Sequence, residues 1–317
     1  MITSDVIVVG GGPAGSTCAW KLGQAGIETL VLDRSAFPRP KPCAGWITPR
    51  VLRHLEIDEH RVPCSISRFS RFHVHFPRFT LPLPTLQYAI RRIEFDDWLL
   101  RRSGAPVQTH TVREIRREGG YFLIDDTYRS KVLVGAGGSS CPVARTFFPE
   151  MHTRNGPFTI AAIEAEFQSD QSDRRCHLWF AERGLPGYSW YVPKSSGHVN
   201  VGIGGYSVRL KQSGVNIRRH WENFVERLIK QSFLAGPPSE FWGYSYAVRH
   251  DSHPVQSENC YILGDAAGLA TNDMGEGIGP AVESGILAAR AIANGTEYSV
   301  RSIRRQSIRD ILLPWVH

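Results

Sequence analysis

The sequence contains no apolar run of the roughly 18 to 20 residues that a membrane-spanning helix needs. It also contains no internal repeat, no low-complexity tract and no long linker. Met1 leads within four residues into the first predicted strand, which leaves no room for a signal peptide. We therefore expect one compact protein that is made and kept in the cytoplasm.

Patterns typical of metal sites are missing as well. The six cysteines show no C-x-x-C spacing and no accompanying histidine pair, so a metal site is not expected. In a reducing compartment they are predicted to be free thiols. They are Cys18, Cys43, Cys64, Cys141, Cys176 and Cys260. Only Cys43 lies in a sequence that suggests chemistry.

Acidic residues are fewer than basic ones, 30 against 37, and the formal net charge is +7. The arginines form dispersed pairs without a recognised nucleic-acid-binding module, so nucleic acid is not an expected partner. A net positive field attracts anionic lipid headgroups or a diphosphate substrate. Ordinary solvated arginines are the alternative interpretation.

The first 33 residues combine a buried strand, a glycine turn that opens a helix, and an acid at the end of a second strand. Gly10 allows the tight turn, Gly12 lets the backbone approach a pyrophosphate, and Gly15 lets the helix pack on the sheet. The helix N-terminus favours an anion there. Asp33 is placed to accept a hydrogen bond from a ribose hydroxyl, so a ribose that carries a 2′-phosphate is disfavoured. Together these features predict a bound dinucleotide.

A second small-residue turn near the C-terminus indicates which dinucleotide is bound. The segment 264–268 follows a short predicted strand and carries one acid, Asp265. The glycine-rich turn 274–280 then opens a predicted helix at 281–293. Asp265 is placed to hydrogen-bond a polyol such as the ribityl chain of a flavin.

These turns resemble the FAD signatures of the p-hydroxybenzoate hydroxylase-like flavoproteins: Gly10–Gly15, Gly264–Gly268 and Gly275–Ile278. The segment Lys41–Gly45 is similar to the P-x-x-C-G-G loop of geranylgeranyl reductases, with Ala44 in place of the first glycine. The chain therefore resembles FAD-dependent oxidoreductases of that family.

Two further segments resemble the geranylgeranyl reductases. Tyr188–Pro193, followed by Gly202–Gly204, is similar to their Y-x-W-x-F-P…G-x-G element, with Val192 in place of Phe. Arg92–Asp96 is similar to their R-x-x-F-D helix start. The matches keep the family's order along nearly the whole chain.

The resemblance implies an α/β fold with a discontinuous Rossmann-like FAD-binding domain and an inserted β-sheet substrate domain. The FAD-binding domain is expected at 1–62, 86–152 and 243–317, and the substrate domain at 63–85 and 153–242. The residues expected to bind FAD are Gly10, Gly12, Pro13, Ala14, Gly15, Asp33, Arg34, Cys43, Ala44, Gly45, Arg92, Val112, Gly264, Asp265, Gly277 and Ile278.

The same resemblance places Cys43 beside the isoalloxazine ring, where its thiol either lends a proton or only shapes the pocket. Tyr188 and Trp190 are the other expected catalytic residues. With Tyr191 they are expected to line an apolar cavity suited to a hydrocarbon chain. A sheet face packed on its own core is the alternative for these aromatic residues.

Two segments bear on partners. Gly137 stands where many relatives carry an acid linked with FAD and the nicotinamide donor, so NAD(P)H, a ferredoxin and a quinol all remain open as the electron donor. In the C-terminal tail, Ile303, Ile308, Ile311 and Leu312 fall near one helical face opposite arginines. That face either contacts a membrane surface or docks on the protein itself.

Three functional classes follow. The first is an FAD-dependent reductase of C=C bonds in a prenyl or other lipophilic substrate. The second is a flavin-dependent monooxygenase or halogenase. The third is a flavoprotein without turnover of its own, such as an electron carrier.

Overall fold

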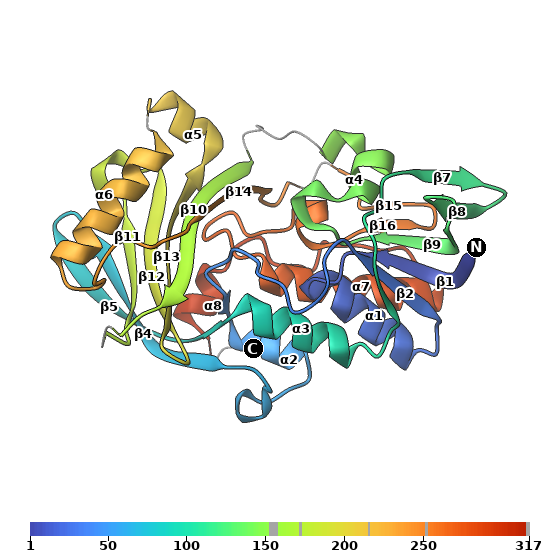
Figure 1. Ribbon diagram of the computed structural model, residues 1–317, viewed down its shortest axis with the longest axis horizontal. Coiled ribbons are helices and arrows are strands. Elements are labelled where there is room, and N and C mark those ends of the chain that lie inside the picture. Colours follow the sequence, from blue (N-terminus) through green and yellow to red (C-terminus); the bar gives the residue numbers. More distant parts are fainter. Residues whose placement is uncertain (152–157, 171–172, 215, 251–252, 315–317) are drawn as a thin grey trace.

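The computed structural model describes residues 1–151, 158–170, 173–214, 216–250 and 253–314. Two β-sheets dominate it and lie side by side along the longest axis (Figure 1). The sheet that contains the N-terminal strand is flanked by helices α1, α3 and α7, and the other sheet carries α6 on its far side.

The first sheet has a parallel centre in the order β16-β9-β1-β2-β6, and β15, β7 and β8 extend it with antiparallel pairings. Its strands are β1 (Ile2–Val9), β2 (Thr29–Asp33), β6 (Val107–Thr109), β7 (Ile115–Glu118), β8 (Tyr121–Ile124), β9 (Tyr128–Gly135), β15 (Gln256–Ser257) and β16 (Cys260–Ile262).

Strand β1 shows why the sequence of a strand in this sheet is an almost continuous apolar run. Val6 and Val8 pack under α1 and α7, while Ile7 and Val9 join a second cluster on the opposite face. A parallel sheet is covered on both faces, so its strands need apolar side chains at successive positions.

The second sheet is antiparallel except where β4 pairs in parallel with β11, and its strand order is β14-β10-β13-β12-β11-β4-β5-β3. Its strands are β3 (Trp46–Ile47), β4 (Ile66–Phe76), β5 (Phe79–Ile90), β10 (Thr159–Gln168), β11 (Cys176–Phe180), β12 (Gly187–Lys194), β13 (His198–Tyr206) and β14 (Trp242–Ala247).

The two faces of the second sheet have different neighbours because side chains alternate along a strand. On one face Tyr191 packs among apolar residues of α6 such as Phe224. On the other face Trp190 and Val192 pack with Met274, which belongs to a loop after the first sheet. The second face therefore faces the turns expected to bind FAD. We call these the FAD-type turns: Gly10–Gly15, Gly264–Gly268 and Gly275–Ile278.

Helices connect and cover the sheets, and in the described part of the chain five 3₁₀ turns lie between them. The helices are α1 (Pro13–Gln24), α2 (Pro49–His54), α3 (Arg92–Arg102), α4 (Pro142–Phe147), α5 (Ser207–Gln212), α6 (Ile217–Lys230), α7 (Ile278–Asn294) and α8 (Ile308–Leu312). The 3₁₀ turns are η1 (Glu59–Arg61), η2 (Gly138–Ser140), η3 (Pro149–Met151), η4 (Glu182–Gly184) and η5 (Gly264–Ala267).

The expected fold is confirmed: a discontinuous Rossmann-like unit with a second sheet contributed by intervening segments. The domain boundaries stay a prediction. The boundary near 152–153 lies outside the described residues, and β3, which falls in the segment 1–62, pairs with the second sheet.

The segment from Val107 to Ile115 is not one continuous strand, because the Asp125 carboxylate accepts the backbone N–H groups of Arg113 and Glu114 in place of a neighbouring strand. One local expectation is corrected. The C-terminal helix is only α8, so Ile303 lies outside it. No helix among the described residues has the length and apolar character needed to span a bilayer.

Candidate functional site

The glycine turn after β1 leaves an open space in front of the N-terminus of α1. A Cβ on Gly10, whose φ is +112°, would lie 2.4 Å from the Ala136 carbonyl oxygen, and one on Gly15 would lie 1.9 Å from that of Gly10. At Gly12 the nearest atom to a Cβ is Nη2 of Arg39, at 3.7 Å. A side chain would therefore clash at Gly10 and at Gly15, whereas the backbone at Gly12 stays open to a ligand.

Asp33 ends β2 beside this turn. Its carboxylate accepts the backbone N–H groups of Gly11, at 2.8 Å, and Ser35, at 3.0 Å. Each oxygen keeps a further lone pair for a ribose hydroxyl. Arg39, which sequence reasoning missed, lies 3.8 Å from Asp33 and 3.7 Å from Asp96. A cation here suits a pyrophosphate, and its only sequence signal is its place in a proline-rich loop.

Asp265 lies on η5 and faces a second glycine turn. A Cβ on Gly277 would lie 3.2 Å from Oδ1 of Asp265. Within the described part of the chain, no protein group hydrogen-bonds to this carboxylate, so it is available to a ligand hydroxyl. The residues of both turns therefore fit the phosphates, ribose and ribityl chain of FAD.

The Cys43 loop is anchored to the second sheet. Gly45 adopts φ +69°, and a Cβ there would lie 2.0 Å from the Ile90 carbonyl oxygen. The Ile90 N–H donates to the Gly45 carbonyl over 2.8 Å. Both Lys194 Nζ and Asn200 Nδ2 donate to the Cys43 carbonyl oxygen over 3.3 Å. These contacts fix the loop through its backbone, and within the loop the Cys43 Sγ accepts the Gly45 N–H over 3.3 Å.

Arg92 lies behind the same loop. Its guanidinium forms a two-pronged pair with Asp96, at 2.7 and 2.8 Å. Burial acts to lower the pKa of Arg92, but Asp96 and then Cys43 raise it above its ordinary value. Arg92 is therefore a permanent buried cation close to the Cys43 side chain.

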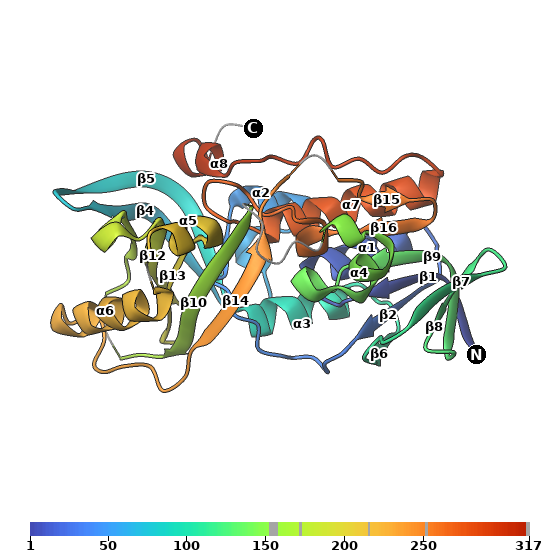
Figure 2. The same ribbon diagram turned by 90° about the horizontal axis from the view of Figure 1, so that it is seen from above.

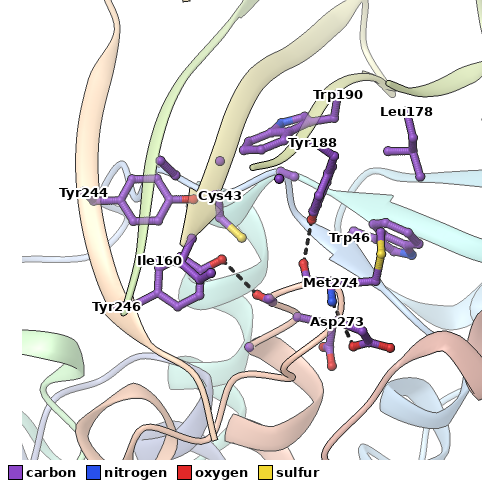
Figure 3. A pocket seen from close by; sticks show the side chains of 18 of the residues that line it. Cys43, Trp46, Ile160, Leu178, Tyr188, Trp190, Tyr244, Tyr246, Asp273 and Met274 are labelled. Atoms are coloured by element: carbon purple, nitrogen blue, oxygen red, sulfur yellow. Dashed lines mark hydrogen bonds between the residues drawn. The ribbon is translucent and has the colours of Figure 1, made fainter. Parts of the chain in front are cut away.

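A cavity of about 840 Å³, a volume that includes solvent at its open mouth, lies between the second sheet, the Cys43 loop and the segment Asn272–Ile278. Figure 3 shows the Cys43 sulfur pointing into it. The residues that border the cavity include Ala44, Trp46, Ile160, Leu178, Tyr188, Trp190, Tyr244, Tyr246, Gly277 and Ile278. One space is thus bordered by the Cys43 loop, the FAD-type turn and aromatic side chains.

Trp190 owes its place in the cavity wall to a glycine on the neighbouring strand. Trp190 pairs with Gly202, and a Cβ there would lie 2.2 Å from the indole ring. Its Nε1 donates to Asn200 Oδ1 over 2.7 Å, so the ring is held in one orientation. Tyr191 points to the opposite face against α6, and the expectation that it lines the cavity is wrong because side chains alternate along β12.

Three tyrosine hydroxyls hold the loop that leads into the FAD-type turn. Tyr188 donates to the Met274 carbonyl over 2.5 Å, and Tyr206 donates to the Asn272 carbonyl over 2.5 Å. Tyr246 donates to the Gly275 carbonyl over 3.2 Å. The second sheet therefore positions this loop, and the Tyr188 hydroxyl is already engaged in doing so.

A buried polar network, which sequence reasoning also missed, lies beneath the Cys43 loop. Glu164 accepts from Tyr244 over 3.1 Å, and burial raises the pKa of Glu164 to about 7 against the opposing pull of Lys194. Glu166 pairs with the buried Lys194 and with Arg91. Burial acts to raise the pKa of Glu166, but Lys194 holds it below its ordinary value.

The remaining residues expected to bind FAD are dispersed. Pro13 and Ala14 open α1 next to the glycine turn, and Gly264 begins η5 with φ +56°. Arg34 is exposed beyond the end of β2. Val112 is buried with Leu32 in the core of the first sheet, between β6 and β7.

Comparison with known proteins bears on the cofactor. Residues 3–58 match the model of a family described as an FAD binding domain. The protein binds FAD. This match contains both β1 with its glycine turn and Asp33, so it covers the pyrophosphate and ribose parts of the site.

Similarity also extends over nearly the whole FAD-binding chain. A geranylgeranyl diphosphate reductase of Rhodobacter capsulatus is 28% identical over 309 residues, which are 90% of this chain and 74% of that protein. The expected resemblance to FAD-dependent oxidoreductases of the geranylgeranyl reductase type is confirmed. The protein is an FAD-dependent oxidoreductase that is similar to geranylgeranyl reductases over most of its length.

Solved structures share the fold of this flavoprotein. A geranylgeranyl bacteriochlorophyll reductase-like protein of Thermoplasma acidophilum superposes with a TM-score of 0.79 and 23% identity, over 93% of this chain and 79% of that one. A flavin-dependent brominase superposes with a TM-score of 0.70 and 19% identity, over 96% of this chain and 81% of that one. The fold alone therefore does not choose between reduction and halogenation.

Proposed function

We propose that this flavoprotein reduces carbon–carbon double bonds of a prenyl or other lipophilic substrate in the cavity beside Cys43. The observation that carries the proposal is a thiol at the wall of an apolar, aromatic cavity that also borders the FAD-type turn at Gly277 and Ile278. The name of the Rhodobacter capsulatus relative points to a substrate of the same class.

Reduction of an isolated double bond adds a hydride to one carbon and a proton to the other. Reduced FAD, when bound, supplies the hydride. Cys43 holds a proton at Sγ and gives it to the second carbon, and the resulting thiolate regains a proton from water after the product leaves. Arg92, which is paired with Asp96, lies close behind the Cys43 side chain.

The walls of the cavity suit such a substrate. Trp46, Leu178 and Trp190 offer apolar surface to a hydrocarbon chain and exclude water from the reacting carbons. Tyr188, Tyr206 and Tyr246 hold the loop that borders the cavity and so keep its shape. Tyr188 and Trp190 are thus proposed as residues that shape and position, with Cys43 as the proton donor.

The electron donor of the proposed reductase is predicted to be NAD(P)H, a ferredoxin or a quinol. Binding of FAD is proposed to use the contacts expected from the sequence, from Gly10 to Gly15, at Asp33 and at Asp265, with Arg39 added as a phosphate ligand.

Anaerobic turnover tests the proposal. Chemically reduced protein mixed with geranylgeranyl diphosphate under argon should reoxidise its flavin and yield a product with two more hydrogens for each reduced bond. Reoxidation that requires O₂ would contradict the proposal in favour of oxygen-dependent chemistry. Reoxidation by small electron acceptors alone would favour an electron carrier. The protein freed of FAD is the control.

A further inference from the structure

The β4–β5 hairpin carries apolar side chains that the protein leaves in contact with water. The exposed fractions are 39% for Phe76, 59% for Phe79 and 47% for Leu81. Cross-strand pairing puts Phe76 opposite Phe79, and Val74 opposite Leu81, so these side chains share one face of the sheet. Large exposed apolar side chains that gather on one face indicate an interaction surface.

This exposed face is continuous with the wall of the cavity. Ring centroids follow one another from Phe79 to Phe76 at 4.9 Å, from Phe76 to Phe180 at 5.9 Å, and from Phe180 to Tyr188 at 5.3 Å. Tyr188 then lies 5.7 Å from Trp190, and both border the cavity. A strip of aromatic rings therefore leads from the hairpin tip to the cavity beside Cys43.

The charge of the hairpin is of one sign. Between Ile66 and Ile90 the sequence has three arginines and no aspartate or glutamate. Arg78 is exposed in the turn between the two strands, next to Phe79. Aromatic and basic side chains at one tip match the two layers of an anionic membrane surface, where rings enter the interface and cations meet phosphates.

The outer edge of β5 does not suit another strand. Strand β3 covers this edge only at Tyr88 and Ala89. Pro82 and Pro84 lie on the uncovered part and provide no N–H group to a partner strand. Figure 2 shows α8 beside β5, where the Thr85 hydroxyl donates to the Ile311 carbonyl over 2.6 Å. Helix α8 thus docks on the protein and leaves the hairpin tip open.

We infer that the β4–β5 hairpin docks on an anionic lipid membrane, and that the aromatic strip guides a lipid chain from the membrane to the cavity. The guiding role of the strip rests on the proposed function. Docking itself does not, because it requires only the exposed hairpin.

Co-sedimentation with vesicles of phosphatidylcholine and phosphatidylglycerol in equal parts tests the docking. The FAD-loaded protein should pellet with the vesicles, and Phe76→Ser combined with Phe79→Ser should lower the apparent affinity by about tenfold or more, because two rings no longer enter the interface. Arg78→Glu, a surface change that leaves the fold intact, should lower it by about fivefold or more on these vesicles and hardly at all on pure phosphatidylcholine.

Phe241→Ser is the matched control, since Phe241 is 38% exposed but packs near Trp221 of α6, away from the hairpin. It should bind vesicles as the wild type does, and all variants should retain yellow FAD. Wild-type protein that stays in the supernatant, or hairpin variants that bind equally well, would overturn the inference. So would a dimer that separates in the hairpin variant without any vesicle binding, because that result would assign the surface to a second copy of the chain.

The guiding role has its own readout. The Phe76 and Phe79 double variant should turn over vesicle-embedded substrate at least about fivefold more slowly than the wild type, yet match it on substrate in detergent micelles. Equal loss in both presentations would overturn the guiding role. If no variant or wild type turns over any prenyl substrate, the proposed function fails while the vesicle result still stands.

Discussion

The Tyr244 hydroxyl donates a hydrogen bond to Oε2 of Glu164 over 3.1 Å, at a point where Tyr244 borders the cavity and Glu164 is buried behind it. Asn200 Nδ2 lies 3.4 Å from the other oxygen of Glu164 and also contacts the Cys43 carbonyl. An acid with a raised pKa therefore lies one hydrogen bond away from the cavity.

This acid makes stability depend on pH. Burial raises the pKa of Glu164 from 4.5 to about 7 in the folded protein. Below pH about 4.5 both the folded and the unfolded states hold the proton, so no stability is lost. Between about 4.5 and 7 only the folded state holds it, and the free energy of unfolding falls by up to on the order of 3 kcal/mol as pH rises.

Glu164→Gln should remove this contribution. Thermal unfolding followed between pH 5 and 8 should show a decline in the wild type that is visibly flatter in the variant. Glu226→Gln, on the exposed face of α6, is the control and should keep the wild-type slope. Parallel curves for wild type and Glu164→Gln would contradict the assignment of a raised pKa to this residue.

The two glycines of β13 give a matched pair of core substitutions. Gly202→Ala places a Cβ 2.2 Å from the Trp190 ring, whereas Gly204→Ala meets its nearest atom at 3.5 Å. Overpacking should cost Gly202→Ala about 1 to 3 kcal/mol in the free energy of unfolding, while Gly204→Ala stays within about 0.5 kcal/mol of the wild type. Denaturant unfolding measures both, and equal stabilities would show that the glycine is not needed for Trp190.

Loss of the Asp265 carboxylate should weaken FAD binding. Asp265→Ala leaves a ligand hydroxyl without its acceptor, which costs roughly 1 to 3 kcal/mol, or about tenfold to a hundredfold in affinity. Quenching of FAD fluorescence during titration of the apoprotein measures this. Asp126→Ala, an exposed acid paired with Arg116 far from the turns, should bind FAD normally. Unchanged affinity in Asp265→Ala would remove this residue from the cofactor site.

The FAD-binding half of the site was predictable because its geometry is local. The spacing of Gly10, Gly12 and Gly15 predicts where the backbone turns and where a phosphate approaches it. Asp33 follows at the end of the next strand. Cys43 could be singled out for the same reason, since its loop is a short motif in itself. Gly10, Gly12 and Gly15 lie at the turn after β1, and Asp33 ends β2, as their spacing predicts, while their role in FAD binding stays a prediction.

The wall behind Cys43 was not predictable, because its residues come from separate strands. Glu164, Asn200 and Lys194 meet only through the register of β10, β13 and β12, and no short motif links them. Tyr191 was assigned to the wrong face for a related reason: an aromatic run does not state which of its side chains points inward until the neighbours of the strand are known. Arg39 could not be predicted, because its closeness to Gly12 depends on how the loop that carries it folds.

Single-turnover reoxidation of the reduced flavin by a prenyl substrate, in the absence of O₂, tests the central claim most directly. The proton at Cys43 Sγ should be required for the step, so Cys43→Ser and Cys43→Ala should reoxidise at least about a hundredfold more slowly than the wild type while FAD binding changes little, since proton donation by a positioned group contributes about that much. Equal rates in all three proteins would contradict the account and leave Cys43 as a residue that only shapes the loop.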